Sequence, residues 1–452
     1  MMARSDYLKL ADAIAADIAS GSLKAGDRLP PQRNFAYERN IAVSTASRVY
    51  SELLRRGLVV GEVGRGTFVS GDARHDARLG VTVPAEPHGA RIDLEFNYPL
   101  LPTQSAMIAK SLQGLFLPDA LEAALRPAAS HGTPLARATS ATYLARQGWS
   151  PNADRIVFTA NGRQCIAAAL AAVVPAGGRC GVEALTYPFV KGIAARLGIT
   201  LVPLAMDEHG VRPDAVQRAH REGRLSALYV QPVMQNPLGI TMPPSRRTEL
   251  LRVVEKLGLT IIEDAVYGFL EDQAPLAAEA PESCVVLDSL SKKVAPGLAL
   301  GFIVMPQRLR ESVMAAIRSG GWTASGYALA AGQRLMADGT AAELSKLKRM
   351  DAARRQQLAA KYLEGFETQA NSKAYHLWLT LPAHWRSQAF VAAAARRDIA
   401  LTPSTTFAVA AGHAPNAVRL ALGAPTMAQL ETGLQMLSGI LNAREEDFDT
   451  TE

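Results

Sequence analysis

Long apolar runs are missing from this chain of 452 residues. The longest, from Cys165 to Pro175, is far shorter than the roughly 20 residues that a membrane-spanning helix needs. The first twenty residues carry Asp6, Asp12 and Asp17 inside their apolar pattern, which is not the pattern of a signal peptide. We therefore expect a cytoplasmic protein without a membrane partner.

Cysteine is scarce as well. The three cysteines, Cys165, Cys180 and Cys284, are too widely spaced for a disulfide framework or a zinc site, so we expect no metal. Hydrophobic residues make up 48% of the chain and charged residues 20%, which excludes a largely disordered protein. At roughly 150 residues per domain, the length suggests about three domains.

Positive charge is unevenly distributed along the chain. The net charge is +6, from 48 basic and 42 acidic residues. Between Lys24 and Arg65, eight basic residues stand against four acidic ones, an excess that fits a surface facing phosphate. Residues 446–452 are mostly acidic, which predicts a solvated tail.

The first seventy residues predict a winged helix-turn-helix. They contain three helical patterns, of which the second opens at Pro30-Pro31 and the third ends at Gly57. Residues 58–70, LVVGEVGRGTFVS, are two short β-rich runs around glycines, which predicts a hairpin. Three helices closed by a hairpin form a DNA-binding unit, which we place at residues 1–70.

The rest of the chain predicts an α/β protein. Residues 71–90 are rich in Gly, Asp, Arg, His and Pro and predict a linker. Beyond them, β-rich runs such as LTIIEDA and CVVLDSL alternate with helical patterns, which indicates a mainly parallel sheet covered on both faces. Within residues 91–445 we expect a large domain at about 105–325 and a small α+β domain at about 326–445.

A lysine lies in a turn with two serines directly after one of these strands. The run is Ser289-Leu290-Ser291-Lys292, followed by Lys293. A lysine amine in this place can form a Schiff base with an aldehyde, and the serine hydroxyls can hold a phosphate. The alternative for such a run is a surface loop with two solvated lysines.

Other polar residues follow predicted strands in the same way. Residues 161–164, Asn-Gly-Arg-Gln, open a helix whose first amides can bind phosphate. Asp264 and Tyr267 follow a buried strand, where an aspartate is also a common helix N-cap. Three more residues lie near predicted strand ends: Tyr187, Asn236 and Arg419. Taken alone, Tyr187 indicates a packing residue, Asn236 a turn and Arg419 a salt bridge.

In this order, the motifs resemble those of the fold-type I aminotransferases, which use pyridoxal 5'-phosphate (PLP). Joined to the winged helix-turn-helix, they resemble the MocR branch of the GntR transcription regulators over about residues 7–441. The resemblance implies that PLP is bound covalently by Lys292 rather than Lys293. It also implies a homodimer, because fold-type I sites are built at a subunit interface.

The same resemblance assigns roles to the other residues. Asp264 pairs with the pyridine nitrogen, Tyr187 stacks on the ring, and Arg419 binds the α-carboxylate of an amino acid. Tyr267 and Asn236 contact the phenolic oxygen. The remaining predicted cofactor-binding residues are Gly162, Arg163, Gln164, Ser289 and Ser291.

Two positions depart from the family pattern. Ala299 stands where the family has an arginine that pairs with the cofactor phosphate, a contact worth roughly 1.5–3 kcal/mol. This change predicts weaker PLP binding, or replacement of the lost base by Arg163 or Lys293. The segment 125–132, LRPAASHG, also lacks the tyrosine that usually reaches the partner subunit's phosphate.

The winged helix-turn-helix carries the predicted contacts to double-stranded DNA. Its third helix presents polar residues to the major groove and turns Tyr50, Leu53 and Leu54 inward. Val43 stands where many relatives carry an arginine. The alternative is a protein-interaction module with a solvated basic face. The predicted DNA-binding residues are Arg33, Ser44, Thr45, Ser47, Arg48, Arg65 and Gly66.

Together, these features predict a dimeric transcription regulator at the bacterial nucleoid. Its aminotransferase-like domain senses an amino acid, an amine or a B6 vitamer through a Lys292 aldimine and changes operator binding. One alternative is an active aminotransferase with a DNA-binding appendage, which amino-group transfer abolished by Lys292→Ala would identify. Another is a regulator that has lost PLP and uses the domain for dimerisation, which Ala299 favours.

Overall fold

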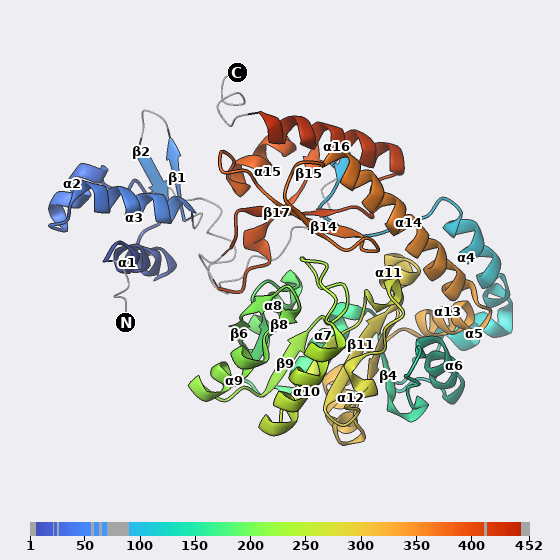
Figure 1. Ribbon diagram of the computed structural model, residues 1–452. Coiled ribbons are helices and arrows are strands. Elements are labelled where there is room, and N and C mark those ends of the chain that lie inside the picture. Colours follow the sequence, from blue (N-terminus) through green and yellow to red (C-terminus); the bar gives the residue numbers. More distant parts are fainter. Residues whose placement is uncertain are drawn as a thin grey trace. The chain divides into compact units, whose positions relative to one another are not determined.

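The computed structural model describes residues 6–20, 22–24, 27–55, 58–62, 66–69, 90–410 and 414–443. These residues form two compact units, one within residues 6–69 and one made of 90–410 and 414–443. We describe each unit by itself (Figure 1). The predicted acidic tail, Arg65 and the predicted linker except its last residue lie outside the described residues.

The N-terminal unit is the predicted winged helix-turn-helix. Its elements are α1 (Asp6–Ser20), α2 (Gln32–Glu38), α3 (Val43–Arg55) and an antiparallel hairpin of β1 (Val59–Glu62) and β2 (Gly66–Val69). The apolar faces of the three helices meet in one core that contains Ile14, Phe35 and Leu53. Tyr50 packs edge-on against Phe35, with ring centroids 5.5 Å apart, and its hydroxyl donates to the carbonyl of Pro30.

A seven-stranded sheet forms the centre of the larger unit. The strand order is β4-β12-β11-β10-β9-β5-β6. All neighbours run parallel except β12, which is antiparallel to β4 and β11, so the prediction of a mainly parallel sheet is confirmed. The strands are β4 (Ile156–Thr159), β5 (Arg179–Glu183), β6 (Thr200–Leu204), β9 (Ala227–Val230), β10 (Thr260–Asp264), β11 (Cys284–Ser289) and β12 (Gly301–Val304).

Helices cover both faces of this sheet (Figure 1). One face packs on α7 (Gly162–Val173), α8 (Pro188–Arg196) and α12 (Arg310–Ser319). The other packs on α6 (Pro134–Leu144), α9 (Pro213–Glu222), α10 (Pro244–Leu257) and α13 (Gly326–Ala337). Because both faces are covered, the strands are apolar almost throughout rather than alternating. The remaining elements are α4 (Gln104–Leu112), α5 (Pro118–Leu125), α11 (Leu290–Lys293), β7 (Met206–Asp207) and β8 (Gly210–Val211).

A second, smaller sheet has the order β13-β14-β17-β16. It contains the two predicted strands, β14 (His376–Thr380) and β17 (Ala417–Ala421), and adds β13 (Thr368–Ala370) and β16 (Thr402–Pro403). Its core contains residues of α15 (Ser387–Ala395) and α16 (Met427–Asn442), together with the end of α14 (Thr340–Tyr362). The N-terminal strand β3 (Ile92–Asp93) pairs with β15 (Ile399–Ala400), so the start of this unit joins the small domain.

The packing of α13 bears on the boundary between the two domains. Leu329 and Leu335 of this helix belong to the same core as Phe158 and Phe302 of the large sheet. The helix therefore packs with the large domain, although a boundary at about residue 325 assigns it to the small one. Among the described helices, none is long and apolar enough to cross a bilayer.

The large core offers a direct test of this packing. Phe302 on β12 is fully buried and lies edge-on to Phe158, with ring centroids 6.0 Å apart. We expect Phe302→Ala to lower the free energy of unfolding by about 3–5 kcal/mol, because the lost contacts leave a cavity. Urea unfolding measures the change, and Met350→Ala, on the exposed side of α14, serves as the control. Equal stability of the two variants would contradict this core.

Candidate functional site

A cavity of about 270 Å³ lies at the carboxyl ends of β10 and β11 and is lined by both domains. Parallel pairing places Asp264 beside Leu287, so the polar residues that follow the two strands reach the same edge of the sheet. The cavity brings together most of the predicted site residues: Gly162, Arg163, Tyr187, Asn236, Asp264, Tyr267, Ser289, Ser291, Lys292 and Arg419.

Gln164 is the predicted site residue that the structure does not bring to this cavity. Its side-chain oxygen accepts from the backbone N–H of Ala160 at 3.0 Å, which turns the side chain back over the start of α7. Its own N–H donates to Asn161 Oδ1 at 3.1 Å, so this amide is already used to cap the helix. The N–H groups of Gly162 and Arg163, which precede it, start the helix beside the cavity.

Lys292 is one of the residues that line the cavity. Its Nζ donates to the carbonyl of Asn97 at 2.5 Å and lies 4.3 Å from the ring centroid of Tyr98. Burial lowers the pKa of Lys292 to about 7, and the positive charges of Arg163, Arg419 and Lys348 act in the same direction. A lysine with this pKa is partly a neutral amine at neutral pH, which is the nucleophilic form.

A second lysine, Lys348, binds the turn that carries Lys292. Lys348 of α14 is 0% exposed, and its Nζ donates to the carbonyls of Lys292 at 2.9 Å and Val294 at 2.6 Å. A buried lysine amine that donates to carbonyl groups at the end of a helical turn satisfies acceptors that would otherwise have no partner. Lys348 therefore fixes the backbone from which Lys292 projects.

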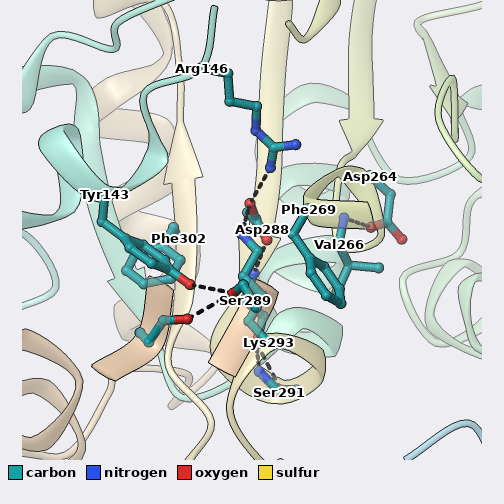
Figure 2. A network of polar contacts seen from close by, with 12 residues as sticks. Tyr143, Arg146, Asp264, Val266, Phe269, Asp288, Ser289, Ser291, Lys293 and Phe302 are labelled. Carbon is teal, nitrogen blue, oxygen red and sulfur yellow. Dashed lines mark hydrogen bonds and ion pairs between the residues drawn. The ribbon is translucent and has the colours of Figure 1, made fainter. Parts of the chain in front are cut away.

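The neighbouring Lys293 points the other way. It forms a buried ion pair with Asp288, whose carboxylate also lies 3.4 Å from the Arg146 guanidinium (Figure 2). Lys293 is not among the residues that line the cavity of Lys292. The two successive lysines therefore differ in their contacts: Lys292 faces the cavity, and Lys293 binds Asp288 at the end of β11.

The two serines of the turn and the start of α7 form a small polar cradle. Ser289 Oγ lies 2.8 Å from Ser291 Oγ and accepts from the N–H of Ser291 at 3.1 Å. A Cβ on Gly162 would lie 3.4 Å from Cβ of Ser289, in ordinary van der Waals contact, so the helix start lies directly beside the serines. Hydroxyls and a helix N-terminus are ligands suited to a phosphate group. Ala299 also lines this cavity and brings no charge to it.

Asp264 is a buried carboxylate with neutral partners. It accepts from the Tyr229 hydroxyl at 2.7 Å, the Gln231 amide at 3.1 Å and the N–H of Val266 at 3.2 Å. Burial raises the pKa of Asp264, and these three donors oppose that change. A buried negative charge is stabilised best by a cation, so this position suits a protonated ring nitrogen of a ligand.

Several polar atoms at the cavity have no protein partner among the described residues. They include Oδ1 of Asn236, Oδ1 of Asn97 and Nε of Arg419. Arg419 is 6% exposed, and its Nη2 donates to the carbonyl of Glu95 and, at 3.1 Å, to Thr402 Oγ1. Because buried polar atoms are costly when unpaired, these atoms indicate a polar ligand.

The sequence motifs missed three residues that complete the cavity. Asn97 accepts from Lys292 through its carbonyl and donates from its side chain to the Tyr267 hydroxyl at 3.1 Å. Tyr98 covers Lys292, and Gln231 donates to Asp264. Asn97 and Tyr98 lie far upstream of the motifs, next to β3, and no spacing signal connects them to Lys292.

In the N-terminal unit, the described side chains among those predicted to face DNA are exposed or half-buried. Arg33, Ser44 and Arg48 are exposed, and Thr45 and Ser47 are half-buried on the same helix α3 as Ser44 and Arg48. Tyr50 and Leu53 are buried, as predicted, whereas the side chain of Leu54 lies outside the described part. Gly66 begins β2 opposite Glu62, and Arg65 lies outside the described residues.

Two family models match the chain. Residues 114–437 match the class I and II aminotransferases, and residues 6–69 match the gntR family of bacterial regulatory proteins. The HTH-type transcriptional regulator YdeF of Bacillus subtilis is 30% identical over 96% of this chain and 94% of its own length. PtsJ of Salmonella typhimurium, named as a vitamin B6 salvage pathway transcriptional repressor, is 23% identical over 84% of this chain and 87% of its own.

Solved aminotransferase structures share the fold of the larger unit. A multiple substrate aminotransferase from Thermococcus profundus has a TM-score of 0.71 and 20% identity, covering 84% of this chain and 96% of its own. At this identity the likeness concerns the fold. It agrees with the mainly parallel seven-stranded sheet.

The lowered pKa of Lys292 gives a pH prediction. Only the neutral amine attacks an aldehyde, so labelling of Lys292 should rise with pH through about 7, where this pKa lies, rather than near the 10.4 of a free lysine. Reductive labelling with a small aldehyde, mapped by mass spectrometry across pH, measures the midpoint. N-acetyl-lysine amide in the same tube is the reference, and a shared midpoint would contradict the prediction.

Proposed function

The chain belongs to the MocR-type regulators, in which a gntR-family DNA-binding domain is joined to a class I and II aminotransferase domain, and we propose that its aminotransferase-like domain senses an amine with the help of bound PLP. The observation that carries the proposal is the cavity itself. One space is lined by a nucleophilic lysine, a serine pair, a buried aspartate and a buried arginine, which are the groups that a PLP–amine pair requires.

We assign the cofactor contacts as follows. Lys292 holds PLP covalently, Ser289, Ser291 and the start of α7 hold its phosphate, and Asp264 faces its ring nitrogen. When bound, PLP supplies an electrophilic carbon and an electron sink for chemistry at an amine. The unpartnered Asn236 Oδ1 and the Tyr267 hydroxyl are the groups proposed to contact its phenolic oxygen, with Tyr187 against the ring.

The chain's own residues prepare this site for an amine. Lys348 holds the turn, so that Lys292 Nζ stays in the cavity, and the lowered pKa keeps part of that amine unprotonated. Tyr229 and Gln231 hold Asp264 in one orientation by two hydrogen bonds. Arg419, which arrives from β17 of the small domain, is positioned to bind a carboxylate of the incoming molecule.

The position of the cavity suggests how ligand binding is communicated. Lys292 and Asp264 belong to the large domain, whereas Arg419 and Thr402 come from the small one. A ligand that binds both sides favours one relative arrangement of the two domains. We propose that this choice alters the spacing of two DNA-binding units in a homodimer and thereby alters operator affinity.

Exposed apolar side chains support the homodimer. Several large hydrophobic residues at the surface lie between residues 100 and 135, before and after α4, at the end of α5 and at the start of α6: Leu100, Phe116, Leu117, Leu125 and Leu135. A group of this kind is typical of a protein–protein interface. The second subunit is the partner that a fold-type I site requires.

An active aminotransferase is the second candidate function. The joint presence of Lys292, Asp264 and Arg419 in one cavity favours it, and Ala299 argues against it because a charged phosphate contact is missing. Transfer of the amino group to a 2-oxo acid, abolished in Lys292→Ala, would distinguish catalysis from sensing.

The covalent link to Lys292 can be tested by absorption spectroscopy. After PLP is added and the excess removed, the protein should show a visible band that Lys292→Ala lacks, because only the amine can hold the aldehyde covalently. Lys256→Ala, at an exposed position of α10, is the matched control and should keep the band. A band of equal strength in Lys292→Ala would refute the assignment.

The DNA-binding face can be tested with duplexes selected from a random pool by the full-length protein. Arg48→Ala should weaken binding about tenfold, because a base-reading arginine is worth roughly 1–3 kcal/mol. Arg196→Ala, an exposed site in α8 of the other unit, controls for the change in net charge. Gel-shift titrations at two salt concentrations measure the effect. Unchanged affinity of Arg48→Ala would eliminate this recognition face.

A further inference from the structure

Three cationic side chains line the Lys292 cavity: Arg163, Lys292 and Arg419. Lys292 is half-buried and donates to the carbonyl of Asn97, and Arg419 is buried and donates to that of Glu95. Arg163 is the exposed one. From the sequence, Arg163 is a predicted cofactor-binding residue and a candidate for the phosphate contact that Ala299 does not make.

The contacts of Arg163 are all with aromatic residues. Its Nε donates to the Tyr187 hydroxyl at 3.3 Å and its Nη2 to the Tyr98 hydroxyl at 3.4 Å. Its Cζ lies 3.5 Å from the ring centroid of Phe189, so the guanidinium is stacked on that ring. In the described part of the chain, no carboxylate lies within ion-pair distance of Arg163. Its charge is therefore held in place but not neutralised.

The acidic residues at the cavity do not supply this missing charge. Asp288 is paired with Lys293 and Arg146, and Asp264 is bonded to Tyr229 and Gln231. A third acidic residue, Glu95, also lines the cavity and forms no ion pair with Arg163. An anionic group of a ligand is the natural partner for a guanidinium held in this way.

The position of Arg163 indicates which part of a ligand it meets. Tyr98 contacts the guanidinium through its hydroxyl and Lys292 Nζ through its ring, at 4.3 Å from the centroid. Arg163 and Lys292 therefore contact the same tyrosine, and the charge of Arg163 adds to the lowering of the pKa of Lys292. Its hydrogen bonds do not involve Ser289 or Ser291, which form the phosphate cradle.

We propose that the sensed molecule is a dicarboxylic amino acid, whose amine reaches the PLP held by Lys292, whose α-carboxylate binds Arg419 and whose second carboxylate binds Arg163. This inference rests on the proposed sensing function and narrows its ligand class. Arg163 and Arg419 line the same cavity as the lysine, so a ligand with acidic groups at both ends can meet both guanidinium groups at once.

The test compares two ligands that differ in charge but hardly in size. Calorimetric titration of the PLP-loaded full-length protein with L-glutamate and L-glutamine gives the ratio of the two affinities. We expect glutamate to bind about tenfold more tightly than glutamine, and Arg163→Gln to reduce this ratio to about one. Arg221→Gln, at an exposed position of α9, should keep the ratio.

Three results would contradict the proposed ligand class. Equal affinity of the two ligands for the unmodified protein, or an undiminished ratio in Arg163→Gln, would overturn the inference. So would an Arg163→Gln variant that keeps the ratio but binds PLP more weakly while binding pyridoxal normally, because that result assigns Arg163 to the cofactor phosphate.

Lys292→Ala separates this inference from the proposed function. If the variant keeps both the visible PLP band and the glutamate preference that depends on Arg163, the covalent sensing mechanism fails and the ligand class stands. If the band depends on Lys292 but the preference for glutamate is missing, the proposed function stands and the ligand class fails.

Discussion

The turn after β11 is the constraint on which the rest of the site depends. It is fixed from two sides by buried lysines, because Lys293 pairs with Asp288 at the strand end and Lys348 binds the carbonyls of Lys292 and Val294. Neither lysine faces the cavity. Burial lowers the pKa of Lys348 to about 7 and that of Lys293 to about 8, and hydrogen bonds and one carboxylate offset this burial. The direction of Lys292 is thus determined by groups that do not themselves meet a ligand.

The same arrangement explains how one cavity combines reactivity with recognition. Burial and three nearby positive charges lower the pKa of Lys292, while two of those charges, on Arg163 and Arg419, remain able to bind anions. A group that activates the lysine is therefore also a group that selects the ligand. Ala299 lines the same cavity and brings no charge to it, so the positive charges of the cavity come from Lys292, Arg163 and Arg419.

Much of the fold and of the cavity could be predicted from the sequence, because both follow from strand ends. Lys292 and Asp264 stand at or directly beyond apolar β-rich runs, and parallel strands deliver such residues to one edge. Arg419 instead lies in the middle of β17, in the antiparallel sheet of the small domain, so its place at the cavity follows from the packing of the two domains. Gln164 could not be judged in this way, since its direction depends on a capping bond to Ala160. Tyr98 and Lys348 come from distant segments, and only tertiary packing brings them to Lys292.

In the proposed function, DNA binding depends on the chemistry at Lys292. The most direct measurement is the affinity of the full-length protein for a selected duplex, by fluorescence anisotropy, with and without PLP and L-glutamate. The account predicts that adding both changes the affinity of the unmodified protein and leaves that of Lys292→Ala unchanged. An identical response of the two proteins, or no response in either, would contradict it.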